Sequence, residues 1–137
     1  MSFFEWDQSY SVGVKLIDGQ HKKLFGLISD LYAALDKNAG EKTIPIENII
    51  LDLAAYVDFH FGTEEKYFKE FGFEKSESHT EEHHFYGRKI AEFKDKYKEK
   101  GDEVGEEMMA FLKEWIAGHI KIKDKEYTKC FNEHGLI

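Results

Sequence analysis

The chain has 137 residues, of which 42% are hydrophobic and 15% aromatic, and its net charge is -8 at pH 7. This length and composition allow one hydrophobic core, so we expect a single domain over residues 1–137. The acidic balance argues against nucleic acid or an anionic membrane surface as partner. No apolar run has the length of a membrane span, and the first residues do not form a signal peptide. Because Cys130 is the single cysteine, an internal disulfide is excluded, and we expect a cytoplasmic protein.

Residues 1–17 are rich in aromatic and β-branched side chains and contain Gly13, a pattern that does not favour a helix. We expect them to form an ordered arm that packs on the domain, because burial of so much apolar surface is favourable. The aromatic residues of this arm are Phe3, Phe4, Trp6 and Tyr10.

Asp18 has the character of an N-cap, and leucine and isoleucine follow it at helical spacing, which predicts a first helix over about 18–37. His21 lies in the first turn of that helix. The positive end of the helix dipole disfavours an imidazolium there and therefore favours neutral, metal-binding imidazole.

Three further helices are predicted from the hydrophobic pattern, over about 45–71, 76–100 and 104–119. Pro45 is tolerated in a first helical turn, Gly72 ends the second helix, and Ser76 or Ser78 can cap the third. Beyond Asp124 we expect a polar tail. Long helices joined by short loops pack as antiparallel neighbours, so the predicted fold is all-α, an up-down-up-down four-helix bundle over residues 18–137 with an ordered N-terminal arm.

Histidine and carboxylate side chains interrupt the apolar stripes of these helices. His60 and Glu64 are four residues apart, as are His79 and His83, and a step of four residues turns a helix by only about 40°. Burying such groups without partners would cost roughly several kcal/mol, and no lysine or arginine shares their stripes. A bound cation resolves this cost. The candidate ligands are His21, His60, Glu64, His79, His83, His119 and Asp124.

Imidazole and carboxylate without cysteine or methionine suit iron, manganese or zinc. One ion cannot use seven side chains, but two ions can if Glu64 and Asp124 each bridge both. Three histidines on one ion, two on the other and a shared oxo or hydroxo bridge then give one six-coordinate and one five-coordinate metal. The odd number of histidines leaves one open position, where an external ligand would bind.

His119 and Asp124 are five residues apart, which on a regular helix corresponds to a rotation of about 140°. Side chains so oriented cannot converge on one site. We therefore predict that a π-bulge or a break interrupts the fourth helix between these two residues.

In this pattern the chain resembles the hemerythrin family, specifically the single-domain bacterial hemerythrins. The motifs that carry the resemblance are YSVGV at 10–14, IDGQHKKLF at 17–25, HFGTEE at 60–65, His79 with His83, and WIAGHIKIKD at 115–124. They occur in order over nearly the whole chain. The resemblance implies a four-helix bundle around two Fe ions, Fe2+ or Fe3+, with an oxo or hydroxo bridge, which binds O2 reversibly.

The resemblance also implies a role for each candidate ligand. By this reading His79, His83 and His119 hold the coordinatively saturated iron, and His21 and His60 hold the iron with the open position. Glu64 and Asp124 would be the bridges.

The resemblance favours an O2-binding protein, used for carriage, storage, delivery or sensing, over an enzyme. The apolar residues that we expect around the open position are Phe25, Tyr56, Ile116 and Ile120, which offer little acid-base machinery.

The alternative is a di-iron enzyme acting on peroxide or nitric oxide. We rank it lower because redox bundle proteins of the carboxylate type use about four glutamates with two histidines, whereas here the balance is reversed. A structural metal or a metal-free bundle is the third interpretation.

The remaining polar residues are read as surface. His84 and His134 are expected to be solvated. Glu65, Glu81 and Glu82 are assigned to a solvated face, although one of them could accept a hydrogen bond from a ligand imidazole. We expect a free-standing domain and a monomer, since no apolar stripe is left over, with O2 as ligand and a redox or O2-accepting partner that the sequence does not identify.

Overall fold

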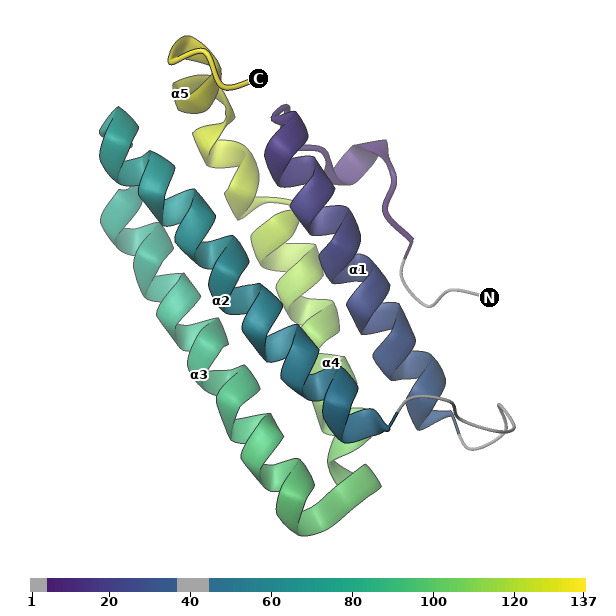
Figure 1. The fold of residues 1–137 in the computed structure, drawn as a ribbon. Coiled ribbons are helices and arrows are strands. Elements are labelled where there is room, and N and C mark those ends of the chain that lie inside the picture. The colour runs from purple at the N-terminus through teal and green to yellow at the C-terminus, as the bar shows by residue number, and fades with distance from the viewer. Residues whose placement is uncertain (1–4, 37–44) are drawn as a thin grey trace.

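The computed structural model of the chain describes residues 5–36 and 45–137, and the side chains of Ile116 and Ala117 lie outside this description. The predicted packing of Phe3 and Phe4 therefore also falls outside the described residues. Four helices pack side by side: α1 (Lys15–Leu35), α2 (Ile46–Phe71), α3 (Ser76–Lys100) and α4 (Gly105–Trp115). The chain direction alternates from each of these helices to the next (Figure 1). The prediction of an all-α four-helix bundle is confirmed.

The first helix begins earlier than predicted. Its N-cap is Val14, which is extended, and Asp18 lies inside the first turn. The Asp18 carboxylate accepts hydrogen bonds from the backbone N–H of Val12 at 2.8 Å and from the Ser11 hydroxyl at 2.6 Å. The N-cap assignment was therefore wrong, because Asp18 reaches back to the arm that precedes the helix. A carboxylate in the first turn also stabilises the helix dipole.

Gly72 ends α2 as predicted, but the predicted N-cap of α3 is not found. Gly72 has φ 64° in the left-handed region, where glycine is favoured, and its N–H bonds to the Phe68 carbonyl. Neither predicted serine caps α3: its N-cap is Lys75, Ser76 is already helical, and Ser78 donates its hydroxyl to the Lys75 carbonyl.

The fourth helix changes form after Trp115. A π-helical segment, η3 (Ile116–Ile120), leads into a turn, then into a 3-10 segment, η4 (Lys123–Tyr127), and a short helix, α5 (Thr128–Glu133). The predicted interruption between His119 and Asp124 is confirmed. The predicted polar tail is wrong, because Tyr127 and Phe131 are both 0% exposed and stack with ring centroids 4.4 Å apart.

Two apolar clusters form the core. The larger fills the bundle between α1, α2, α3 and α4. The smaller cluster, which we call the end cluster, lies where the arm, α2 and the C-terminal segments meet, and consists of Val12, Val14, Ile17, Phe68, Phe73, Tyr127 and Phe131. Hydrogen bonds from Thr128 and Asn132 to the carbonyls of Val12 and Gly13 fasten the arm to α5. Among the described helices, none is both long and apolar enough for a membrane crossing.

Candidate metal centre

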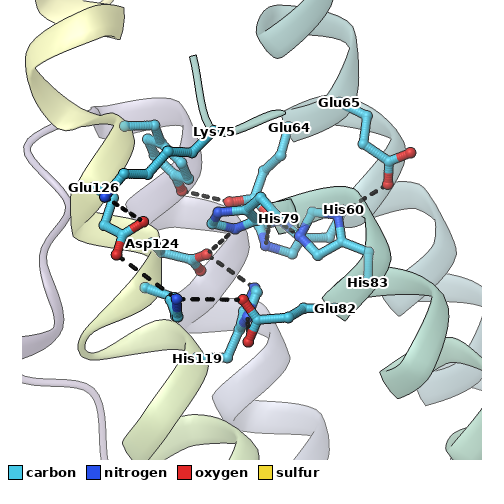
Figure 2. A network of polar contacts seen from close by, with 12 residues as sticks. His60, Glu64, Glu65, Lys75, His79, Glu82, His83, His119, Asp124 and Glu126 are labelled. Atoms are coloured by element: carbon cyan, nitrogen blue, oxygen red, sulfur yellow. Dashed lines mark hydrogen bonds and ion pairs between the residues drawn. The ribbon is translucent and has the colours of Figure 1, made fainter. Parts of the chain in front are cut away.

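All seven predicted ligand residues converge between the two apolar clusters. His21 comes from α1, His60 and Glu64 from α2, and the other four from α3, η3 and η4. Each of the seven side chains is at most 1% exposed. Figure 2 shows the side chains from α2, α3 and the segments after α4 pointing toward one another.

The ligand atoms of these residues form two overlapping groups. One group contains three histidines, His79, His83 and His119, together with both carboxylates; the other contains His21 and His60 with the same two carboxylates. Within each group the atoms that could bind an ion lie within 4.8 Å of one another. The two groups share Glu64 and Asp124, so the geometry suits two ions joined by two carboxylates.

Each carboxylate contacts histidines of both groups. Asp124 Oδ1 lies 2.8 Å from His79 Nε2 and 3.0 Å from His119 Nε2, and its Oδ2 lies 3.1 Å from His21 Nε2. Glu64 Oε1 lies 3.2 Å from His60 Nε2. The same oxygen lies 3.3 Å from the Nε2 atom of His83 in the other group.

Several of these contacts are close without being hydrogen bonds. Glu64 Oε1, His83 Nε2, His119 Nε2 and Asp124 Oδ2 are buried and have no hydrogen-bond partner among the described residues. Buried polar atoms that approach within about 3 Å without forming hydrogen bonds are costly unless another partner satisfies them. Atoms that instead point toward a common centre fit bound cations, so the donor set fits a pair of iron-type ions.

The electrostatics of the cluster favour ionised carboxylates. Burial raises the pKa of Asp124, but the neighbouring His119, His21 and His79 outweigh this and hold it well below its usual range. Burial lowers the pKa of His83, yet the neighbouring carboxylates of Glu64 and Glu65 raise it to about 9. Without a metal, protonated histidine therefore supplies the positive charge that the buried carboxylates need.

Outside the cluster, polar groups lie near the far nitrogens of three histidines. His83 Nδ1 lies 2.9 Å from Glu65 Oε2, and His119 Nδ1 lies 3.6 Å from Glu82 Oε1. The sequence allowed one of Glu65, Glu81 and Glu82 to accept a hydrogen bond from a ligand imidazole, and in the structure Glu65 is placed to do so. Sequence reasoning missed Gln20, whose Oε1 lies 2.7 Å from the Nδ1 atom of His60. Its adjacency to His21 was the one signal available.

Sequence reasoning also missed Tyr127. Its hydroxyl donates a hydrogen bond of 2.5 Å to Glu64 Oε2. Burial first, and then the nearby carboxylates of Glu64 and Asp124, raise the pKa of this phenol well above its usual value. The phenol therefore remains a proton donor to Glu64.

The predicted apolar lining and the predicted surface histidines occupy different environments. Phe25 and Ile120 are 2% and 0% exposed and belong to the bundle core, against which Tyr56 is partly buried. The side chain of Ile116 lies outside the described part of the structure. His84 and His134 are exposed, as expected.

Comparison with known proteins places this geometry in a family. The family model described as "Hemerythrin HHE cation binding domain" matches residues 12–130. The chain belongs to the hemerythrin family. The bacteriohemerythrin of Clostridium acetobutylicum is 34% identical over 126 residues, which covers 90% of this chain and 98% of that protein. The bacteriohemerythrin of Pseudomonas aeruginosa PAO1 is 28% identical over 128 residues, 93% of this chain and 81% of that protein.

Solved hemerythrin structures share the fold. A crystal structure of wild-type hemerythrin superposes with a TM-score of 0.81 at 27% identity and covers 94% of this chain and 98% of that one. The hemerythrin fold predicted from the motifs is thus confirmed. The buried histidine and carboxylate cluster fits the cation-binding description of the family.

Proposed function

We propose that this hemerythrin binds O2 reversibly at a centre of two iron ions held by His21, His60, Glu64, His79, His83, His119 and Asp124. The observation that carries the proposal is the division of these buried ligand atoms into a group with three histidines and a group with two, which share both carboxylates. The group with fewer histidines would leave one coordination position open for an external ligand. When bound, the two ferrous ions would supply the electrons that O2 takes up, one from each iron.

The protein residues fix the geometry of the pair. Glu64 and Asp124 each face both groups and would set the spacing between the ions. Glu65 and Gln20 orient the rings of His83 and His60 through their outer nitrogens, which also fixes the tautomer of each ring.

The side chains that we expect around the two-histidine group offer little acid-base chemistry, which favours binding over catalysis. Phe25 follows His21 by one helical turn in α1, and Tyr56 precedes His60 by one turn in α2. Ile120 is fully buried in the bundle core. We propose that these side chains, with Ile116, line the O2 pocket and slow the delivery of protons to bound ligand.

The test is iron content together with the visible spectrum of the reduced protein under argon, then in air, then under argon again. We expect two irons per chain and a coloured form that appears in air and reverses. His60→Ala should abolish the two-iron centre and the coloured form. His84→Ala is the matched control, since His84 is an exposed histidine on α3, and it should retain both.

The rival function is a di-iron enzyme acting on peroxide or nitric oxide. The exposed edge of the site at Glu65 and Glu82 is the observation in its favour, because it offers a route for protons to the histidines. Steady turnover of peroxide with a reductant, well above that of free iron, would establish the enzyme. Immediate and irreversible oxidation in air would also count against reversible O2 binding.

A further inference from the structure

Two of the outer nitrogens in the three-histidine group, those of His83 and His119, lie near carboxylates. His83 Nδ1 lies 2.9 Å from Glu65 Oε2, within hydrogen-bond distance. His119 Nδ1 lies 3.6 Å from Glu82 Oε1, too far for a hydrogen bond but close enough for a strong electrostatic contact. Two negative groups therefore stand behind this half of the site, and Glu65 is the closer of the two.

Among the described residues, the outer nitrogens in the two-histidine group have no carboxylate as hydrogen-bond partner. His60 Nδ1 lies 2.7 Å from the amide oxygen of Gln20, whose nitrogen in turn lies 3.3 Å from the Thr63 hydroxyl. His21 Nδ1 is buried without a hydrogen-bond partner among the described residues. The two halves of the site thus differ in the charge behind their ligands as well as in histidine number.

The surroundings of Glu65 and Gln20 suit these different charges. Glu65 is 33% exposed and lines a groove of about 360 Å³ between α2 and α3, whose walls include Gly62 and Gly87. Water in this groove can solvate the carboxylate. Gln20 is only 7% exposed, so a charge at its position would be costly, whereas an amide with two hydrogen-bond partners is not.

A carboxylate that accepts from a ligand imidazole makes that imidazole a stronger donor to its metal. A stronger donor stabilises the higher oxidation state and so lowers the reduction potential. An amide acceptor orients the ring equally well but transfers less charge. We propose that the pair Glu65 and Gln20 makes the iron pair electronically unequal, so that Glu65 lowers the reduction potential of the three-histidine ion and Gln20 keeps that of the two-histidine ion high. This inference rests on the proposed function, because it needs the iron pair.

Two isosteric substitutions exchange charge and amide in opposite directions. Glu65→Gln keeps an acceptor oxygen for His83 but removes the charge, and should raise the reduction potential of the iron-loaded protein. Gln20→Glu adds a charge behind His60 and should lower it. Spectroelectrochemical titration under argon measures both shifts. A purely structural role for these residues would give no pair of shifts of opposite sign.

A second measurement separates orientation from charge. Glu65→Ala removes both acceptor and charge, and should weaken Fe2+ binding by about 10- to 100-fold in competition with a chelator. Glu65→Gln should recover most of that affinity while keeping its raised potential. If Glu65→Gln binds Fe2+ as weakly as Glu65→Ala, with the potential of the parent protein, the electronic role is overturned.

Glu81→Gln is the matched control. It removes the same charge from an exposed residue of α3 that lies between His79 and His83 in sequence. Among the described residues, Glu81 forms no hydrogen bond or ion pair with either histidine. We expect a smaller shift in potential than for Glu65→Gln, and cooperative thermal unfolding of the metal-free variants would show that each folds. Shifts of equal size in the two variants, or of one sign in Glu65→Gln and Gln20→Glu, would overturn the inference. A parent protein that does not hold two irons would overturn the proposed function, and this inference with it.

Discussion

Glu64 has different neighbours on its two oxygens. Oε1 faces His60 and His83, one from each group, while Oε2 accepts the hydroxyl of Tyr127. Burial and the nearby Asp124 raise the pKa of Glu64, but His60 and His83 lower it more, so the carboxylate is ionised. Because the side chain is 0% exposed, water cannot replace any neighbour that is removed. Tyr127 is therefore a structural part of the site, although it lies outside the predicted ligand set.

Tyr127→Phe tests this contribution directly. We expect the free energy of unfolding of the metal-free protein to fall by about 1.5–3 kcal/mol, because an ionised, buried acceptor loses a hydrogen bond. Tyr97→Phe is the control, since the Tyr97 hydroxyl donates to Asp102 at 3.1 Å near the surface, and should change stability by less than about 0.5 kcal/mol. Urea unfolding followed by circular dichroism measures both. If both variants lose the same free energy of unfolding, burial of Glu64 does not strengthen the Tyr127–Glu64 hydrogen bond.

At the scale of whole elements, hydrophobic periodicity was enough to predict the bundle. It placed four helices and brought six of the seven candidate ligands, all but Asp124, onto inward faces, since spacings of four residues depend only on helix geometry. The five-residue spacing of His119 and Asp124 likewise required an interruption, and η3 with the following turn provides it. These features are local in the chain and could be read without tertiary contacts.

Features that depend on distant segments could not be read in this way. Asp18 has N-cap chemistry, but its partners are in the arm that folds back over it. Gln20 meets His60 only because α1 packs beside α2, and 40 positions separate them. Lysines and glutamates made residues 125–137 look polar, and the four-residue spacing of Tyr127 and Phe131 was the one sign of a buried face.

The end cluster should act on the site through α5. Phe131→Ala should destabilise the protein by about 3–5 kcal/mol, because it empties a fully buried position. It should also speed the loss of iron to a chelator, since Phe131 stacks on Tyr127, which ends the segment that carries Asp124. Phe59→Ala is the control: Phe59 is 60% exposed, and its loss should alter neither quantity appreciably. Unchanged iron loss in Phe131→Ala would show that α5 does not support the site.

For the whole molecule, the site couples metal, protons and folding. Its two buried carboxylates need positive charge, which either protonated histidines or metal ions can provide. The pKa of His119 is raised like that of His83: burial lowers it, and the nearby Asp124 carboxylate raises it more. The pKa of His60 is instead lowered, chiefly by burial. Bound metal must displace the protons of His83 and His119. Metal binding and a rise in pH therefore both remove the stability that these protonated histidines provide.

The metal-free protein should consequently lose stability on the alkaline side. A histidine whose folded pKa lies above its ordinary value of 6.5 stabilises the fold fully below pH 6.5, and this contribution disappears as the pH rises through the folded pKa. For His83 that pKa is about 9, so the free energy of unfolding should decline between pH 6.5 and 9 by up to about 3 kcal/mol.

Urea unfolding at a series of pH values, before and after iron removal by a chelator, measures this decline. The iron-loaded protein should lack it, because its His83 has no proton to lose, and should be more stable throughout, by about 2.7 kcal/mol when free metal is 100 times the dissociation constant. His84→Gln, which alters the exposed neighbour of His83, should keep the decline in the metal-free form. His83→Gln should flatten it. A metal-free protein that is equally stable at pH 6.5 and 9 would mean that the carboxylates do not depend on protonated histidine for their counter-charge.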